Sequence, residues 1–129
     1  MDRLGDLLTL AEIEPIRVFD GVVVRRVEGE RTTLAIVELD PDAIVPEHTH
    51  AAEQNGIVIR GRMTFRVGDS ERTFGPGGTW RIRGGISHRA QAGPEGAVVI
   101  DVFSPIRADW EDRERLQRPP RWPDPPDGA

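Results

Sequence analysis

The sequence predicts an all-β domain built from short antiparallel strands, and three observations lead to this prediction. The middle of the chain contains short segments that are rich in Val, Ile and Phe. Turn signals made of Gly, Pro and Asp separate these segments at close intervals. Helix-like periodicity occurs only near the two ends of the chain. Many short strands with closely spaced turns are typical of a sandwich or barrel rather than of alternating β and α units.

The predicted strands follow one another through the middle of the chain. In order, they are Gly21–Val27, Thr32–Leu39, Gly56–Arg60, Met63–Val67 and Ala97–Phe103. The breaks between segments are Asp40-Pro41-Asp42, Gly68-Asp69-Ser70, Gly75-Pro76-Gly77-Gly78 and Gly93-Pro94.

Two short helical segments are expected at the ends. An apolar stripe near the N-terminus predicts a short helix, although Gly5 weakens it; the stripe consists of Leu4, Leu7, Leu8 and Leu10. Residues Ala108–Gln117 predict a second, charged helix. The expected organisation is an N-terminal segment (1–14), a barrel (15–110) and a tail (111–129) that is charged and then proline-rich.

The tail cannot form regular secondary structure from Arg118 onward, because Pro lacks the backbone N–H and fixes φ. Its prolines are Pro119, Pro120, Pro123, Pro125 and Pro126. The composition favours a disordered end. The alternative is an extended arm that packs Trp122 against the barrel or against a partner subunit.

Length and charge limit the classes of function. A chain of 129 residues has room for one core. The net charge is -5 and the 17 basic residues are scattered, so we expect neither nucleic-acid binding nor membrane association. The absence of cysteine excludes disulfides, zinc fingers and thiol catalysis. The N-terminus is acidic where a secretory signal would be basic, and we therefore expect a cytoplasmic protein.

Three histidines are the most informative feature of the sequence. His48 and His50 are two positions apart, so on a strand their imidazoles project from the same face. Gln54 follows and can bring a carbonyl oxygen to the same place, with Glu53 as a rival ligand. His88 follows a turn at Gly84-Gly85 and would join the pair from a neighbouring strand of a closed barrel. We expect one divalent metal ion here; the alternative is ordinary surface or core histidines.

The segments around these histidines resemble the two signature motifs of the cupin superfamily. The first motif reads H-x-H, three or four residues, an acid, six residues and Gly; here Gly61 follows Gln54 after six residues. The second motif reads G, five residues, P-x-G-x-x-H; here it runs from Gly77 to Gly85-x-x-His88. The resemblance spans roughly Pro15 to Trp110 and implies a double-stranded β-helix, the jelly-roll barrel of cupins.

The sequence departs from these motifs at three positions. Gln54 stands where many cupins have a Glu ligand, Arg83 replaces the usual Pro, and Ala92 replaces the usual Asn. Three neutral imidazoles and a neutral amide leave the full charge on the ion, so that it polarises a bound oxygen strongly. This ligand set suits Zn, Ni, Co, Mn or Fe(II), and affinity alone does not choose among these metals. It makes oxygen-activating iron chemistry less expected.

A carboxylate interrupts the last apolar strand at Asp101. Burying it is unfavourable unless it is paired, hydrogen-bonded or near the metal. By alternation Asp101 and Phe103 share a face, which predicts a general acid/base and a flat apolar surface for a substrate if that face is the interior. The alternative is that Asp101 pairs with a neighbouring Arg at an edge strand. Arg107 could bind a substrate carboxylate bidentately, or could simply be solvated.

Two stretches together resemble one branch of small cupins, the KdgF-type proteins of pectin and alginate catabolism. These are His48-Thr49-His50-Ala51-Ala52-Glu53-Gln54 and Asp101-Val102-Phe103-Ser104-Pro105-Ile106-Arg107, which match the family patterns H-x-H-x-x-x-Q and D-x-F-x-P-x-R. The family linearises 4,5-unsaturated uronates to open-chain ketones with the help of a metal. The resemblance implies metal ligands at His48, His50, Gln54 and His88, and active-site roles for Asp101, Phe103 and Arg107. Ile57 replaces an aromatic residue that is frequent in relatives, which suggests a different substrate.

The expected mechanism is ring opening in which the metal stabilises charge on a sugar oxygen and Asp101 moves the proton. Arg107, or alternatively Arg81, would hold the substrate carboxylate. Two other classes remain open: another cupin enzyme (a dioxygenase, an isomerase or epimerase, or a polyketide-type cyclase), and a non-enzymatic metal-dependent module that binds a sugar or acid. We expect a homodimer that pairs through sheet edges.

Overall fold

A computed structural model describes residues 5–124 of the chain. In this part the regular secondary structure is almost entirely antiparallel β-strand, which confirms the predicted fold class. The strands are β1 (Ile16–Phe19), β2 (Val22–Glu28), β3 (Thr33–Leu39), β4 (Ile44–His48), β5 (Glu53–Val67), β6 (Ser70–Phe74), β7 (Thr79–Ile82), β8 (His88–Ser104) and β9 (Glu114–Arg115). The two single-turn 3₁₀ helices are η1 (Leu10–Glu12) and η2 (Ala108–Trp110).

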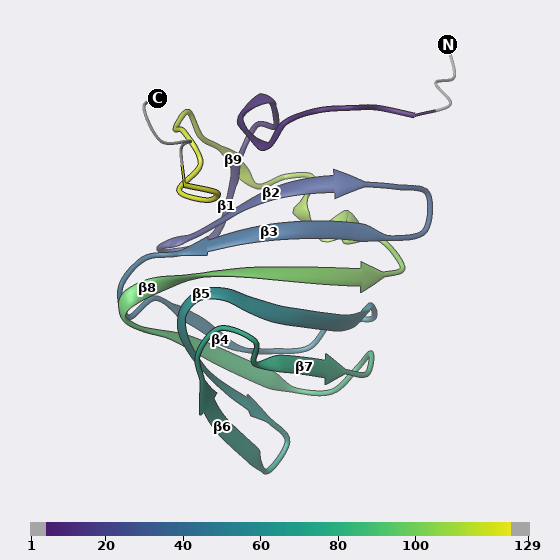
Figure 1. Ribbon diagram of the computed structural model, residues 1–129. Helices are drawn as coiled ribbons and strands as arrows, with labels where there is room; N and C mark the ends of the chain where they lie inside the picture. The colour runs from purple at the N-terminus through teal and green to yellow at the C-terminus, as the bar shows by residue number, and fades with distance from the viewer. Residues whose placement is uncertain (1–4, 125–129) are drawn as a thin grey trace.

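The strands of residues 5–124 form one continuous sheet that folds over on itself (Figure 1). The long strands β5 and β8 pair along most of their length and take part in both layers. The second half of β8 pairs with β3, and the layer continues through β2 and β1 to β9. The first half of β8 pairs with β4, and the second half of β5 pairs with β6. Strand β7 pairs with the first half of β5 and so extends the layer that contains β3.

The two long strands bend where glycines bring their backbones together. Gly61 has a φ of +80°, and a Cβ at this position would lie 2.1 Å from the carbonyl oxygen of Gly96. Only glycine tolerates this conformation and this approach without strain. The pairing register between β5 and β8 shifts at the same place. Residues 56–60 and 63–67, predicted as two strands, are therefore one bent strand.

The inner face of the folded sheet carries a mostly apolar core that leaves a cavity at its centre. Alternate residues of β2, β3 and β8 point inward and are buried: Val22, Val24, Ala35, Val37, Leu39, Val99 and Phe103. This period of two directs alternate side chains of each strand to the inner face. Asp101 lies on the same inner face of β8, so a carboxylate interrupts an otherwise apolar wall.

The helices predicted at the two ends are not found. Near the N-terminus the chain makes only the single turn η1, Leu7 is fully exposed, and Leu4 lies outside the described residues. The predicted helix Ala108–Gln117 is wrong: it consists of the turn η2 followed by strand β9, which pairs with β1. Trp110 is buried by this arrangement and β1 gains an edge partner, whereas a charged helix without an apolar stripe would bury nothing. Within residues 5–124, no helix is long and apolar enough to cross a membrane.

The tail is ordered against the barrel as far as residue 124, so the disorder favoured by its composition is wrong for this part. Arg118 donates to the buried carboxylate of Glu38 over 3.1 Å, and the backbone N–H of Arg121 donates to it over 2.7 Å. Prolines prevent regular structure here but leave an extended arm free to form these bonds. Trp122 is half-buried. Pro125 and Pro126 lie outside the described residues. We call residues 118–124 the C-terminal arm.

Candidate metal centre

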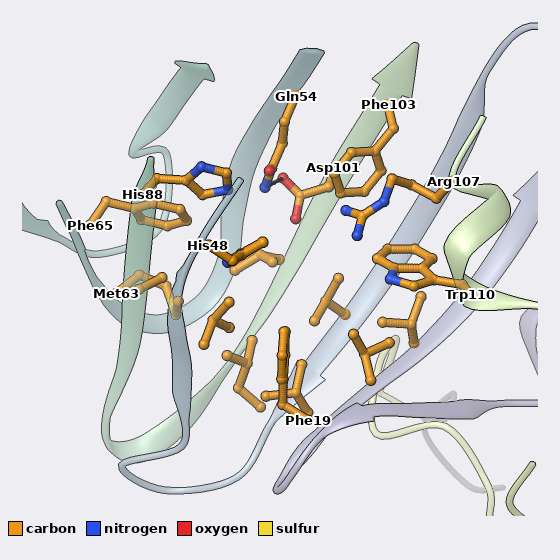
Figure 2. A pocket seen from close by; sticks show the side chains of 18 residues that line it. Phe19, His48, Gln54, Met63, Phe65, His88, Asp101, Phe103, Arg107 and Trp110 are labelled. Atoms are coloured by element: carbon orange, nitrogen blue, oxygen red, sulfur yellow. Dashed lines mark hydrogen bonds between the residues drawn. The ribbon is translucent and has the colours of Figure 1, made fainter. Parts of the chain in front are cut away.

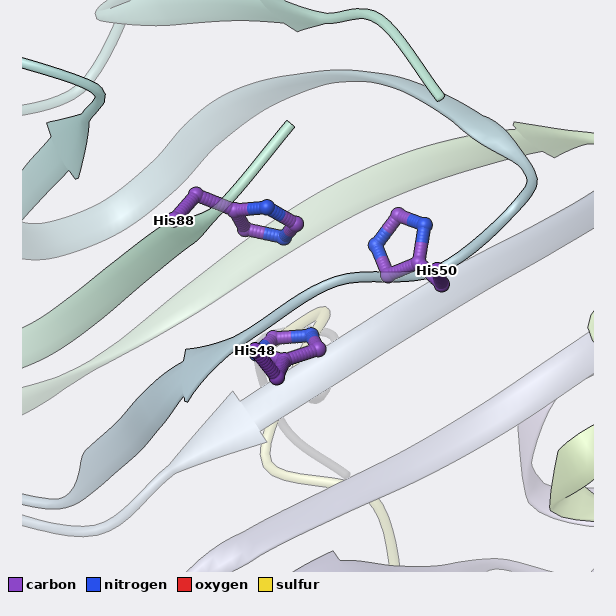
Figure 3. Close-up of side chains that lie close together, drawn as sticks. All are labelled: His48, His50 and His88. Carbon is purple, nitrogen blue, oxygen red and sulfur yellow. The ribbon is translucent and has the colours of Figure 1, made fainter. Parts of the chain in front are cut away.

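All three histidines of the chain meet at one end of the barrel (Figure 3). His48 ends β4 and pairs across the sheet with His88, which begins β8. His50 follows two residues after His48 and faces the same side. One ring nitrogen from each histidine lies within 4.8 Å of the corresponding atoms of the other two. The strand spacing and the β4–β8 pairing together bring the three imidazoles to one point.

The backbone assigns the tautomer of each ring. The Nδ1 atoms of His48 and His50 lie 2.7 Å from the carbonyl oxygens of Pro46 and Ala52, and Nδ1 of His88 lies 2.8 Å from that of Ile86. A carbonyl oxygen only accepts, so each Nδ1 carries the proton and donates it. Each Nε2 is then left with a free lone pair, which is the state of a metal-binding imidazole.

The Nε2 atoms of His88 and His50 lack a hydrogen-bond donor among the described residues. Nε2 of His88 is buried and has no hydrogen-bond partner among the described residues. Nε2 of His50 lies 3.1 Å from Oε1 of Gln54, so that two acceptor atoms face each other. Burial lowers the pKa of His88 to about 4, and burial also lowers the pKa of His50. Neutral rings with unpaired, converging lone pairs fit a divalent cation and leave polar atoms unsatisfied without one.

Gln54 and Glu53 lie on opposite faces of β5. Gln54 is 7% exposed and faces the histidines, whereas Glu53 is exposed on the outside. The Gln54 side chain donates from Nε2 to Oδ1 of Asp101 over 2.9 Å, and this bond directs Oε1 toward His50. Of the two residues considered as a fourth ligand, only Gln54 therefore presents an oxygen to the cluster.

Asp101 is buried beside this cluster, on the central strand β8 rather than at an edge. Its Oδ1 accepts hydrogen bonds from Gln54 and from Nε1 of Trp80, the latter over 2.7 Å. Among the described residues no Arg forms an ion pair with it. Burial raises the pKa of Asp101 to about 6, against the lowering effect of these hydrogen bonds. Its second oxygen points into the cavity (Figure 2).

Sequence reasoning missed Trp80, which fixes the Asp101 carboxylate from β7. The Trp80 ring stacks on Phe65, with centroids 4.2 Å apart. The contact between Trp80 and Asp101 lies directly over the Cα of Gly56. A Cβ at this position would lie 2.3 Å from the indole and 2.4 Å from Oδ1 of Asp101. A glycine inside a strand marks such a close approach, so Gly56 was the available signal.

Phe103 and Arg107 form the wall of the cavity next to Asp101. The Phe103 ring packs edge-on against His50, with centroids 5.6 Å apart, and is 2% exposed. Cζ of Arg107 lies 4.7 Å from the centre of the Phe103 ring and 4.3 Å from that of Trp110. The guanidinium is therefore held between two aromatic rings, as cation–π contacts favour. Arg107 is buried rather than solvated.

Arg107 already has a carboxylate partner. Its Nε and Nη2 donate to the two oxygens of Asp109 over 2.9 and 2.8 Å. These hydrogen bonds lower the pKa of Asp109, which stays ionised near neutral pH. Two other residues considered at the sequence level lie outside the cavity: Arg81 and Ile57 are exposed on the outer face of the sheet. Ile57 therefore does not shape the cavity.

The cavity itself is small and asymmetric (Figure 2). It measures about 60 Å³, which is room for water molecules or part of a small ligand. Its polar wall consists of His48, Gln54, His88, Asp101 and Arg107. The opposite wall is apolar and consists of residues such as Val18, Val22, Val24, Val37, Leu39 and Met63. Arg107 also lines a second hollow with His50 and Asp109, on the outside of the same wall.

Known structures share this fold. KdgF from Halomonas sp. is 25% identical to this chain, with a TM-score of 0.75; the match covers 81% of this chain and 97% of that one. An RmlC-like cupin from Shewanella frigidimarina NCIMB 400 is 21% identical, with a TM-score of 0.76 and coverage of 84% and 98%. Oxalate decarboxylase from Bacillus subtilis, in a structure that concerns its Mn(II) centres, is 20% identical, with a TM-score of 0.73 and coverage of 90% and 34%. The last two likenesses show the fold alone.

A family model described as a cupin domain matches residues 35–103. The search of curated proteins gave no match. The family match covers more than half of the chain and includes β3, the histidine cluster and Asp101. It confirms the resemblance seen in the two sequence motifs, and the chain belongs to the cupin family.

Proposed function

We propose that this cupin is a metal-dependent enzyme that opens the ring of 4,5-unsaturated uronates. The observation that carries the proposal is the hydrogen bond from Gln54 to Asp101, which joins a three-histidine cluster to a buried carboxylate with a raised pKa. Similarity to KdgF from Halomonas sp. over nearly the whole of that chain supports the choice of substrate class.

The metal would be held by Nε2 of His48, His50 and His88, with Oε1 of Gln54 as the fourth ligand. When bound, such an ion supplies Lewis-acid stabilisation of negative charge on a sugar oxygen. Gln54 keeps its oxygen toward the cluster only because Asp101 accepts its N–H. The amide therefore couples the orientation of the ligand to the position of the proton-transfer group.

Asp101 would carry the proton in both halves of the reaction. With a pKa of about 6 it is mostly ionised at pH 7, and its cavity-facing oxygen can accept the proton of the anomeric hydroxyl. As that proton leaves, the bond between C1 and the ring oxygen breaks, which yields a C1 aldehyde and an enolate at C5. Asp101 then returns the proton to C4 and the C5 ketone forms. The reaction is an isomerisation and needs no co-reactant.

Arg107 and Phe103 would bind the sugar. The guanidinium faces the cavity between two aromatic rings and supplies positive charge for the uronate carboxylate. Phe103 holds His50 in its edge-on contact and closes the cavity wall beside Asp101. Trp80, which stacks on Phe65, donates to Oδ1 of Asp101 and so holds the carboxylate in position.

The test is turnover of 4,5-unsaturated galacturonate by protein loaded in turn with Ni, Zn, Mn or Fe(II), followed as loss of ultraviolet absorbance. We expect at least one metal to accelerate the loss and a chelator to stop it. His50→Ala should lose bound metal and turnover together, whereas Asp101→Asn should lose turnover and keep the metal, as measured by elemental analysis. Asp112→Asn, an exposed carboxylate outside the site, is the matched control. Absence of acceleration with every metal, in protein shown to contain that metal, would overturn the proposal.

A further inference from the structure

The indole of Trp110 carries a polar atom that no group in residues 5–124 satisfies. Trp110 is 3% exposed, and its Nε1–H has no acceptor among the described residues. Leaving a buried donor unpaired is unfavourable. Trp110 lines the cavity, and Figure 2 shows its nitrogen on the side of the ring that faces inward. The donor therefore points at the space that a ligand would fill.

Arg107 lies on the face of the same ring. Its guanidinium is 4.3 Å from the centre of the Trp110 ring, and it lies beside the cavity near Nε1 of Trp110 (Figure 2). Asp109 binds Nε and Nη2 and lines only the outer hollow. Asp109 thus fixes the guanidinium from outside and leaves Nη1 available on the cavity side.

The two unsatisfied donors have the chemistry of an anion site. A guanidinium N–H and an indole N–H in adjacent, stacked planes can each donate to one oxygen of a single carboxylate. The neighbouring residues Val18, Val24 and Val37 of the cavity wall are aliphatic. In Figure 2 the site lies across the cavity from His88, which leaves the reacting end of a ligand near Asp101.

We infer that Trp110 is a specificity-determining residue whose indole N–H, together with Arg107, binds the carboxylate of an acidic sugar. The inference rests on the proposed function for the choice of a uronate. It adds a donor that the sequence motifs do not include, and it predicts selection of uronates over the corresponding neutral sugars.

The direct test is the indole ¹⁵N–¹H spectrum of zinc-loaded wild-type protein titrated with galacturonate, which has the carboxylate but lacks the unsaturated bond. The chain has three tryptophans and therefore three indole signals. Trp→Phe variants at 80, 110 and 122 assign them. We expect a saturable downfield shift of the Trp110 signal, no shift of the signal of Trp122 in the C-terminal arm, and no shift of Trp110 with galactose. An unmoved Trp110 signal at high galacturonate would overturn the inference.

Kinetics provide the second measurement. Trp110→Phe keeps an aromatic ring beside Arg107 and removes the indole donor, together with the part of the ring system that carries it. We expect KM for 4,5-unsaturated galacturonate to rise about tenfold or more, with a smaller change in kcat, because a hydrogen bond to a charged group is lost. Trp122→Phe is the matched control and should leave KM unchanged. An unchanged KM in Trp110→Phe would show that the indole N–H does not bind the substrate carboxylate.

The two proposals fail separately. A galacturonate-dependent shift of Trp110 without turnover of the unsaturated sugar would keep the carboxylate site and refute ring opening. Turnover with an unmoved Trp110 signal and an unchanged KM in Trp110→Phe would keep ring opening and refute the role of Trp110.

Discussion

Gln54 donates a hydrogen bond from its side-chain amide to Oδ1 of Asp101 over 2.9 Å. The same amide turns its oxygen toward Nε2 of His50, 3.1 Å away. If the amide flipped, its oxygen would face the carboxylate and its nitrogen would face the cluster, so a single bond sets the orientation of both groups. The histidine cluster and the buried acid are therefore one unit.

Replacing Gln54 with Glu should disrupt this unit without changing its shape. The amide donor becomes a carboxylate oxygen, and two carboxylates at this distance share a proton, which raises the pKa of Asp101 further. We expect turnover at pH 7 to fall at least tenfold while bound metal, measured by elemental analysis, stays at the wild-type level. Glu53→Gln is the control on the outer face of β5 and should change neither quantity. Full turnover in Gln54→Glu would show that the amide donor is dispensable.

Asp101 should make the stability of the metal-free protein depend on pH in a defined direction. Its folded-state pKa of about 6 lies above the ordinary value of 3.8, so the folded protein holds the proton more tightly than the unfolded chain. The stability contributed by Asp101 therefore falls as pH rises from about 4 to about 6. The shift of about two units corresponds to about 3 kcal/mol at most.

Asp101→Asn removes this titration and keeps an acceptor for Trp80 and Gln54. Metal-free Asp101→Asn should therefore be more stable than metal-free wild type at pH 7, and the difference should shrink toward pH 4, as measured by urea unfolding at both pH values. Both proteins carry the same other titratable groups, so the difference between them reports on Asp101. A difference that does not change with pH would mean that Asp101 is ionised throughout.

Gly56 should be essential for the position of the Asp101 carboxylate. A methyl group in Gly56→Ala would overlap the Trp80 indole and Oδ1 of Asp101, so the Trp80–Asp101 hydrogen bond must break or β7 must shift. We expect a loss of about 2 kcal/mol or more in the free energy of unfolding and a large loss of turnover. Gly29→Ala is the control, because its methyl group would make only ordinary contacts with Thr32. Wild-type turnover in Gly56→Ala would contradict the role assigned to Trp80.

The sequence predicted those features that depend on local spacing. Strand β3 was predicted to within one residue because it is a short apolar segment bounded by a turn signal, and the cluster of His48, His50 and His88 followed from strand periodicity and the motif pattern. The bend at Gly61 was predicted as a gap between two strands. A glycine looks like a break in the sequence, but here its positive φ turns the strand while pairing with β8 continues on both sides.

The features that were missed depend on contacts between distant parts of the chain. Trp80 reaches Asp101 only because β7 and β8 both pair with β5 and because Gly56 leaves the path open. The order of the tail depends on Glu38, a carboxylate in a strand far away in the sequence. Composition near the tail carries no sign of that partner, which is why the proline content pointed to disorder.

Glu38 should be the main anchor of the C-terminal arm. It is 1% exposed and accepts hydrogen bonds from Nη1 of Arg25, from Nη2 of Arg118 and from the backbone of Arg121. Arg25 is equally buried, and it also donates to the carbonyl oxygen of Arg118. Glu38→Ala would leave the Arg25 charge buried without a carboxylate, which typically costs about 3–5 kcal/mol. Urea unfolding at pH 7 measures this loss.

Truncation after Gln117 should change the effect of that same substitution. Without the arm, Arg25 and Glu38 become accessible to water, and an exposed ion pair contributes only about 0–1 kcal/mol. We therefore expect Glu38→Ala to cost much less in the truncated chain than in the full chain, and this difference is the coupling between the arm and Glu38. Glu28→Ala, which removes a more exposed partner of Arg26, is the control and should cost the same in both chains. An equal cost of Glu38→Ala in the two chains would mean that the arm does not bury this pair in solution.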